Sequence, residues 1–259
     1  MNRYALCIAA VLLLAPSLGF TKEVTEVANW CSEGKKYLLF DRPRNPGDAC
    51  KVIDSRCIRL NNYWCQKHTP GDPWEGAKDS DTNEPIQDPG KHAAFDSPVW
   101  SARAIAIDLR SKYTGVSGGK RKSEKDRLTS AFQIIGAYSP WCDTVGSVTE
   151  TKDKTVGRSC SDGNRPGPNF AGRLCKAPTA NETDPQNCIP GCNCPPTAAR
   201  TLIQGLPGKT ITDDLELFDK RGKPLPNLAI VIRNLAWQEH KRRVSDELVR
   251  RGIALLNEK

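Results

Sequence analysis

Amides, aromatic rings and a cysteine crowd together in the stretch 59–67, which reads RLNNYWCQK. Side-chain amides can both donate and accept hydrogen bonds. An aromatic ring such as that of Trp64 can stack on the face of a sugar or pack in a core. Two interpretations are therefore open. Either the stretch contacts a glycan, or its amides bind backbone groups while Cys65 fixes the segment covalently.

A carboxyl group that stays protonated near neutral pH would add acid chemistry to this stretch. A glutamate behaves in this way when a partly apolar pocket raises its pKa. Glu33, in the sequence NWCSEGKK, follows Trp30 and Cys31 near a predicted helix end and is the catalytic candidate. Glu75, beside Trp74, is a second option. For both residues the alternative is an ordinary surface glutamate.

Other catalytic schemes find little support in the residue types. The three histidines, His68, His92 and His240, lack metal-ligand spacing. No phosphate-binding loop of the form Gly-x4-Gly-Lys-Ser/Thr occurs in the sequence. We therefore expect no metal and no cofactor.

The residues singled out above follow one another in a particular order. An Asn pair precedes an aromatic residue and a lysine, and a Trp-x-Gly loop comes next. A Phe-x-Ser stretch then opens a helix, and a later helix ends in an aromatic-x-Pro element. These features fall on Asn61, Asn62, Trp64, Lys67, Trp74, Gly76, Phe95, Ser97, Tyr138 and Pro140. This order resembles the lysozyme-like superfamily, as found in cell-wall glucosaminidases and phage virion-associated proteins, over about residues 56–145.

The resemblance implies a small helical core associated with a cell-wall glycan. Enzymes of that superfamily protonate the leaving oxygen with a glutamate at the end of a helix before the Asn pair, and Glu33 is the better-placed match. A proline-rich insertion separates Glu33 from Asn61, which departs from the family pattern. The candidates for glycan contact are Asn61, Asn62, Trp64, Trp74, Tyr138 and Trp141.

The N-terminal residues 1–19, MNRYALCIAAVLLLAPSLG, have the features of a secretory signal peptide. Arg3 supplies the positive charge, and an apolar run from Ala5 to Ala15 follows. This run is shorter than the ~20 apolar residues that span a bilayer. We expect cleavage near Gly19–Phe20, no later membrane span, and a periplasmic or secreted protein.

Removal of the signal peptide would leave ten of the 11 cysteines, an even number that predicts disulfide bonds in an exported chain. Five of them precede residue 150 and five follow it, so at least one bridge must cross that boundary if all pair within the chain. Cys142–Cys160 is the natural candidate, and the other pairings stay open. Zinc is the alternative at CIPGCNCPP, but histidine is absent nearby. The ten are Cys31, Cys50, Cys57, Cys65, Cys142, Cys160, Cys175, Cys188, Cys192 and Cys194.

The charge balance favours an acidic partner. The net charge is +8, and it becomes +7 when Arg3 leaves with the signal peptide. A basic exported protein favours acidic polymers such as wall glycans, anionic lipids or nucleic acid. Basic residues cluster at 120–122 and 241–243. A solvated helix face is the simpler explanation of the second cluster.

Several segments are predicted to position these residues. Residues 21–37 show helical spacing, and 68–90 form a long proline-rich loop. Ser97 followed by Pro98 predicts the start of a helix that runs to Tyr113. Ser123 is expected to cap a second helix that ends near Tyr138.

The sequence after residue 148 predicts an irregular cysteine-rich stretch followed by a region with regular secondary structure. Residues 149–196 are rich in cysteine, proline and glycine and have little periodicity. A short helix capped by Thr197 follows, and then a strand with a turn at Arg221-Gly222. Asn227 is expected to cap one long helix through 228–259.

We therefore expect a mainly α protein. It would have a small lysozyme-like helical core, long disulfide-stapled loops and a C-terminal helical region with a short β-hairpin. The division is 1–19 signal peptide, 20–148 lysozyme-like domain, 149–196 cystine-rich connector and 197–259 C-terminal region.

The favoured function is that of an exported cell-envelope structural or interaction protein whose glycan-associated domain is non-catalytic. The alternative is a peptidoglycan-cleaving muramidase or glucosaminidase that uses one glutamate as general acid. Expected partners are cell-wall glycan or another acidic polymer, and envelope or phage-derived assembly proteins. An acidic residue facing a groove along the segment 61–74 would favour the enzyme.

Overall fold

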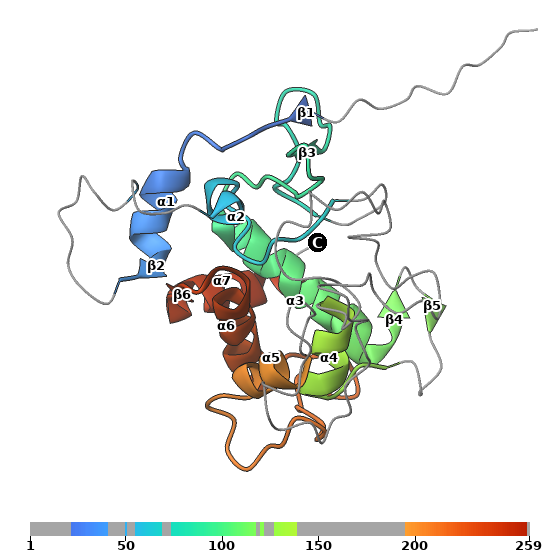
Figure 1. The fold of residues 1–259 in the computed structure, drawn as a ribbon. Coiled ribbons are helices and arrows are strands. Elements are labelled where there is room, and N and C mark those ends of the chain that lie inside the picture. The colour runs from blue at the N-terminus through green and yellow to red at the C-terminus, as the bar shows by residue number, and fades with distance from the viewer. Residues whose placement is uncertain are drawn as a thin grey trace, which may run out of the picture.

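The computed structural model describes residues 22–40, 50, 55–68, 74–117, 120–121, 127–138 and 195–257. Helices dominate this part of the chain, which confirms the expectation of a mainly α protein (Figure 1). The predicted signal peptide, Trp141 and nearly all of the connector 149–196 lie outside the described residues. Within the described residues, no helix is long and apolar enough to cross a membrane.

The central element is the helix α3 (Pro98–Thr114), and local sequence signals set both of its ends. The Ser97 hydroxyl accepts a hydrogen bond from the backbone N–H of Val99, and Pro98 occupies the first turn. Gly115 ends the helix in the left-handed conformation, with φ of 70°. The predicted cap at Ser97 is therefore confirmed.

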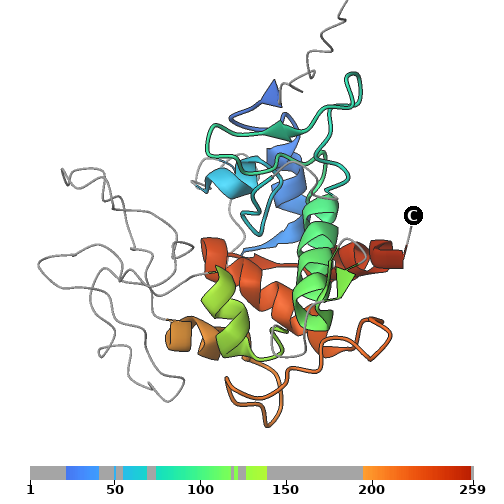
Figure 2. The ribbon, with the colours of Figure 1, turned by 90° about the vertical axis from the view of Figure 1, so that its right-hand side faces the viewer.

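Two C-terminal helices, α6 (Asn227–His240) and α7 (Asp246–Ala254), pack on α3 (Figures 1 and 2). One hydrophobic core joins residues such as Tyr63, Ile105 and Ile134 to Leu235 and Val249. The two regions that flank the connector 149–196 thus share one core instead of packing separately.

Short N-terminal elements are tied to the same body. The helix α1 (Trp30–Tyr37) leads into the strand β2 (Leu38–Leu39). This strand pairs antiparallel with β6 (Arg243–Val244), so that Leu38 lies opposite Val244. The Arg251 guanidinium also donates a hydrogen bond of 2.5 Å to the Tyr37 hydroxyl. The α1–β2 segment is therefore tied to the C-terminal elements β6 and α7.

The first helix is shorter than predicted because a long-range pairing competes with it. The strand β1 (Lys22–Glu23) pairs in parallel with β3 (Ile86–Gln87), and α1 begins only at Trp30. Val24 packs on a small cluster that includes Ile86. A pairing partner so far along the chain leaves no trace in local periodicity.

The second predicted helix also starts later than expected. The helix α4 (Ala131–Tyr138) begins after Ser130, not at Ser123. The Gln133 side-chain oxygen accepts hydrogen bonds from the backbone N–H groups of Thr129 and Ser130. The Ser130 hydroxyl in turn accepts one from the Gln133 N–H. This capping box fixes the start of the helix.

The expected single C-terminal helix is in fact two. α6 ends at Lys241, which adopts the left-handed conformation with φ of 53°. After β6, the Ser245 hydroxyl accepts a hydrogen bond from the Leu248 N–H and starts α7. Asp246 in the first turn adds favourable charge at the helix N-terminus.

The remaining described elements are short. The helix α5 (Pro195–Leu202) packs between α4 and α6. The other short pieces are α2 (Arg56–Arg59), the hairpin strands β4 (Val116–Ser117) and β5 (Lys120–Arg121), and a 3₁₀ turn at Leu255–Asn257. The predicted turn at Arg221-Gly222 is present, closed by a bridge between Phe218 and Pro224.

Two disulfides, Cys31–Cys50 and Cys57–Cys65, lie within the N-terminal half of the chain. Of the five cysteines before residue 150, only Cys142 is then left to be assigned, and both it and its predicted partner Cys160 lie outside the described residues. If every cysteine of the mature chain pairs internally, the bridge across that boundary must start from Cys142. We predict that its partner is one of Cys160, Cys175, Cys188, Cys192 and Cys194.

Non-reducing peptide mapping of the secreted protein tests this expectation. A peptide that carries Cys142 should be linked to one from residues 160–194 and should be released by reduction. A free thiol at Cys142 in fully oxidised protein would contradict the prediction. Peptides linking Cys31 to Cys50 and Cys57 to Cys65 serve as internal controls.

Candidate functional site

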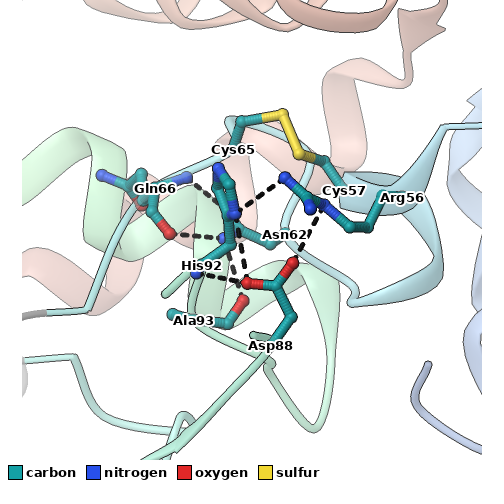
Figure 3. A network of polar contacts seen from close by, with 8 residues as sticks. All are labelled: Arg56, Cys57, Asn62, Cys65, Gln66, Asp88, His92 and Ala93. Carbon is teal, nitrogen blue, oxygen red and sulfur yellow. Dashed lines mark hydrogen bonds and ion pairs between the residues drawn. A yellow bond between two sulfur atoms is a disulfide. The ribbon is translucent and has the colours of Figure 1, made fainter. Parts of the chain in front are cut away.

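The loop that follows α2 is held rigidly by Asn62 (Figure 3). Its side-chain N–H₂ donates to the carbonyl oxygens of Gln66, at 2.7 Å, and Ala93, at 2.9 Å. Its side-chain oxygen accepts a hydrogen bond from the Gln66 N–H. The Cys57–Cys65 disulfide closes the same loop. Asn62 is fully buried, so it positions the loop from beneath the surface.

Asn61 links this loop to the entrances of two helices. Its side-chain N–H₂ donates to the Asn29 side-chain oxygen, at 2.8 Å, and to the Phe95 carbonyl, at 3.2 Å. Asn29 immediately precedes α1, and Phe95 lies just before α3. Asn61 is also fully buried. The two amides therefore bind the backbone, as one of the two sequence-based interpretations expected.

The two described tryptophans of the predicted glycan contacts pack inside the protein. Trp64 is 4% exposed, and its ring N–H donates to the Ile232 carbonyl on α6 at 2.8 Å. Trp74 is 8% exposed, and its ring N–H donates to the Lys67 carbonyl. Neither ring offers an open face to a ligand in this structure.

A charged network of Arg56, Asp88 and His92 lies beside the Asn62 loop (Figure 3). The Asp88 carboxylate is fully buried and lies 2.9 Å from the Arg56 guanidinium. It accepts a hydrogen bond from the His92 N–H and lies 3.2 Å from the His92 ring. Burial lowers the pKa of His92, although the Asp88 charge opposes this shift. The His92 ring is therefore neutral at neutral pH, and the network joins α2 to the segment 88–93.

This Asp–His pair lacks a nucleophile. The nearby cysteines, Cys57 and Cys65, are joined in a disulfide. Among the described residues, no hydroxyl or thiol is hydrogen-bonded to the His92 ring, so a Ser–His–Asp arrangement is not formed. We assign the network a positioning role.

Glu33, the catalytic candidate from the sequence, is held by Ser97. The Ser97 hydroxyl donates to the Glu33 carboxylate at 3.0 Å while it also caps α3. Glu33 is half-buried in the first turn of α1. The contact therefore ties α1 to the start of α3. Glu75, the second option, is exposed and pairs with Arg103 at 3.1 Å.

A different glutamate has the protonation behaviour of a general acid. Glu239 lies in the last turn of α6, and its side chain is exposed to solvent. The surrounding protein nevertheless desolvates the carboxyl and raises its pKa to about 7, although the Lys241 charge acts in the opposite direction. Close to half of this carboxyl is protonated at neutral pH.

The neighbour of Glu239 in the chain contacts the Asn61–Lys67 segment. The His240 ring stands edge-on to the Tyr63 ring, with 5.9 Å between the ring centroids. Burial lowers the pKa of His240 to about 4, so the imidazole is neutral. Burial also raises the pKa of Tyr63. Among the described residues, the buried Tyr63 hydroxyl has no hydrogen-bond partner.

Tyr138, a predicted glycan contact at the end of α4, is close enough to Glu239 for the two groups to interact electrostatically. Its hydroxyl donates to the Asp108 carboxylate, which also pairs with Lys112. Burial raises the pKa of Tyr138, and the charges of Asp108 and Glu239 add to this effect. Glu239 is thus within electrostatic reach of the end of α4. Asp108 is fully engaged by Tyr138 and Lys112.

The end of α6 that carries Glu239 thus contacts the Tyr63 segment through His240 and lies within electrostatic reach of Tyr138 at the end of α4. The Glu239 carboxyl can protonate a leaving oxygen, which is the chemistry of a glycosidase general acid. No group of His, Cys, Asp and Glu side chains suited to a metal ion occurs in the described part of the chain.

Tyr138 was predicted from the sequence as a glycan contact, whereas Glu239 was not predicted. Its sequence context, LAWQEHKRR, carries one usable signal, because an acidic residue stands at the end of a helix that is otherwise apolar. Trp141, the last predicted contact, lies outside the described residues.

The likeness of residues 56–145 to lysozyme-like proteins depends on the order of short features. No family model and no curated protein matches the chain. The likeness therefore stays a prediction, and the site above is defined by contacts within this protein.

Proposed function

We propose that this protein is an exported envelope protein that cleaves a wall glycan, with Glu239 as the general acid. The observation that carries the proposal is the accessible Glu239 carboxyl with a pKa of about 7. A general acid works best when its pKa lies near the working pH. The disulfides Cys31–Cys50 and Cys57–Cys65 support a periplasmic or secreted location.

In this mechanism the protonated Glu239 donates its proton to the oxygen of the glycosidic bond as that bond breaks. Water then forms a bond to the sugar carbon that the leaving oxygen has left, and the Glu239 carboxylate accepts the proton of that water, which restores the acid form. His240 and Tyr138, the two residues discussed above as neighbours of Glu239, are both neutral at pH 7. Their neutrality favours a neutral carboxyl, because no nearby cation from these two residues stabilises its charge.

A non-catalytic, glycan-associated structural or interaction protein is the second candidate. The specific observation in its favour is that Asn61, Asn62 and Trp64 are buried. In addition, Asp108 is held by Tyr138 and Lys112 and is not free to serve as a second catalytic carboxylate. In this case the protein would bind envelope polymer or partner proteins without cleaving the glycan.

The pH dependence of wall cleavage distinguishes the two candidates. Glu239 is protonated below its pKa of about 7 and loses its proton above it. Cleavage should therefore fall as pH rises through 7, by about tenfold for each further unit. The initial rate of turbidity loss of purified peptidoglycan, measured between about pH 5 and pH 9, checks this expectation.

Soluble reducing saccharide should be measured on the same samples, because its release shows that glycosidic bonds break. No release at any pH, together with retention of the protein on peptidoglycan, would overturn the catalytic proposal and favour the second candidate. An activity that rises with pH through 7 would also exclude Glu239 as the acid.

A further inference from the structure

A pocket of about 790 Å³ lies at the C-terminal end of α3, and Glu239 does not line it. Its walls come from the last turns of α3, the residues before α4 and the turn 219–222 between α5 and α6. Figure 2 shows the chain between α5 and α6, in orange, against the lower end of α3. Volumes of this size are typical of small-molecule sites, which range from about 300 to 1,000 Å³.

The turn that forms one wall has a well-defined structure. The Asp219 carboxylate accepts hydrogen bonds from the backbone N–H groups of Arg221 and Lys223, each at 2.8 Å. Gly222 adopts φ of 77°, which a glycine tolerates well. A Cβ at Gly222 would lie 3.8 Å from the Arg110 side chain, so the turn packs beside α3. The positions of Lys220 and Arg221 follow from this packing.

Aromatic residues form the floor of the pocket. The rings of Tyr113 and Phe218 lie with their centroids 5.7 Å apart. The Tyr113 hydroxyl donates to the Asp214 carboxylate, which also accepts the Glu216 N–H. The floor is therefore fixed before any ligand binds.

Basic residues outnumber acidic residues among the side chains that line the pocket. In the described ranges, no ion pair joins Arg110, Lys220 or Arg221 to a carboxylate. Arg110 makes one long hydrogen bond of 3.4 Å to a backbone carbonyl, that of Leu256. The acidic lining residues, Asp214 and Asp219, already accept hydrogen bonds from Tyr113 and from turn amides. An anion beside Arg110 and Arg221 would therefore meet two guanidinium groups that no ion pair among the described residues neutralises.

We propose that this pocket binds an anionic sugar unit, whose carboxylate or phosphate is recognised by Arg110 and Arg221. The planar guanidinium group binds both kinds of anion through paired hydrogen bonds. The Tyr113–Phe218 floor and the Thr114 and Thr129 walls provide the mixed apolar and polar surface that suits a sugar ring. The choice of a sugar rests on the proposed glycan function, whereas the anionic preference rests on the pocket alone.

Calorimetric titration with four probes tests the proposal. N-acetylmuramic acid carries a carboxylate, N-acetylglucosamine 1-phosphate carries a phosphate, N-acetylglucosamine is neutral, and inorganic phosphate lacks the sugar. At least one anionic sugar should bind about tenfold or more tightly than both the neutral sugar and inorganic phosphate, a difference of roughly 1.4 kcal/mol. The anionic sugar that binds better identifies the source of the charge.

Two charge-reversal variants locate the binding. Arg221→Glu should weaken binding of the preferred sugar by about tenfold or more, because a repulsive charge replaces an attractive one at the pocket. Arg250→Glu makes the same change in net charge on an exposed residue of α7 that does not line the pocket, and it should have an effect below about threefold. Circular dichroism of both variants confirms that each is folded.

Three results would overturn the proposal. These are equal binding of neutral and anionic sugars, equal binding of inorganic phosphate and the anionic sugar, or equal losses in the two variants. The titrations are repeated with Glu239→Gln, which should bind as wild type does. Failure of the cleavage proposal would leave these binding results intact, so the two failures are distinguishable.

Discussion

Glu239→Gln should abolish measurable cleavage of peptidoglycan, whereas Glu33→Gln should leave cleavage within about threefold of wild type. A glutamine fills nearly the same space but cannot donate a proton from a carboxyl group. A general acid contributes about 10² to 10⁴ in rate, so the loss of Glu239 should bring the activity down by at least that order. Release of soluble reducing saccharide near pH 6 is the measurement.

Glu33→Gln is a matched control because the change is chemically identical. The glutamine oxygen can still accept the hydrogen bond from the Ser97 hydroxyl. The link between α1 and the start of α3 should therefore survive. Full activity in Glu239→Gln with loss of activity in Glu33→Gln would reverse the assignment and restore the sequence-based candidate.

Stability measurements separate a chemical effect of Glu239→Gln from unfolding. The folded-state pKa of Glu239 is raised from 4.5 to about 7, so the folded protein binds this proton more tightly than the unfolded chain does. The contribution of Glu239 to the stability of the wild type is therefore fully present below the unfolded pKa and is lost as pH rises through about 7. Glutamine lacks this titration. Glu239→Gln should thus be at least as resistant to urea as wild type at pH 8.

Local sequence signals were sufficient to predict an element when residues within or next to that element determine where it begins and ends. α3 is the clearest case, since Ser97, Pro98 and the following apolar face mark its start and its buried side. The turn at Arg221-Gly222 is another. The amides Asn61 and Asn62 also behave as the structural interpretation expected, because both bind backbone groups from within the protein.

The errors arise where distant residues decide the outcome. β1 replaces the start of the first predicted helix because its partner, Ile86–Gln87, lies on the far side of a long loop. The C-terminal helix breaks at Lys241 because β6 pairs with Leu38–Leu39. The start of α4 was a different kind of error, since the Ser130–Gln133 capping box was present in the sequence and was overlooked.

The candidate site was only half predictable for the same reason. Tyr63 and Tyr138 belong to segments that the sequence analysis singled out, but Glu239 lies near the opposite end of the chain. Only the packing of α6 against the Trp64 segment brings it close. Local context could suggest an acidic residue at a helix end, but its raised pKa depends on burial by residues far away in sequence.

The packing of the C-terminal helices on α3 predicts a large loss of stability in Gly252→Ala. A Cβ at Gly252 would lie 2.4 Å from the Ala102 Cβ and 2.7 Å from the Ala102 carbonyl carbon. Neither neighbour can turn away, because one is backbone and the other is fixed to it. Overpacking of this kind costs about 1–3 kcal/mol in the free energy of unfolding. Urea denaturation under oxidising conditions gives the value.

Gly136→Ala in α4 provides the matched control. An added Cβ there would meet nothing within 4 Å, and the position is exposed. Alanine is favoured over glycine in a helix by about 1 kcal/mol, so this variant should be slightly more stable than wild type. The same substitution thus has opposite effects at the two positions. If Gly252→Ala were as stable as Gly136→Ala, α7 could not cross α3 as closely as the structure shows.

Gly252→Ala should also affect the candidate site without touching it. α7 holds β6 and Tyr37 in place, and β6 follows directly from the end of α6 that carries Glu239. If α7 shifts away from α3, the end of α6 loses part of the protein around it, and the Glu239 pKa should fall from about 7 towards its ordinary value of 4.5. The high-pH limb of the cleavage profile should then move to lower pH in Gly252→Ala and stay in place in Gly136→Ala. An unchanged limb in a clearly destabilised Gly252→Ala would show that the setting of Glu239 does not depend on α7.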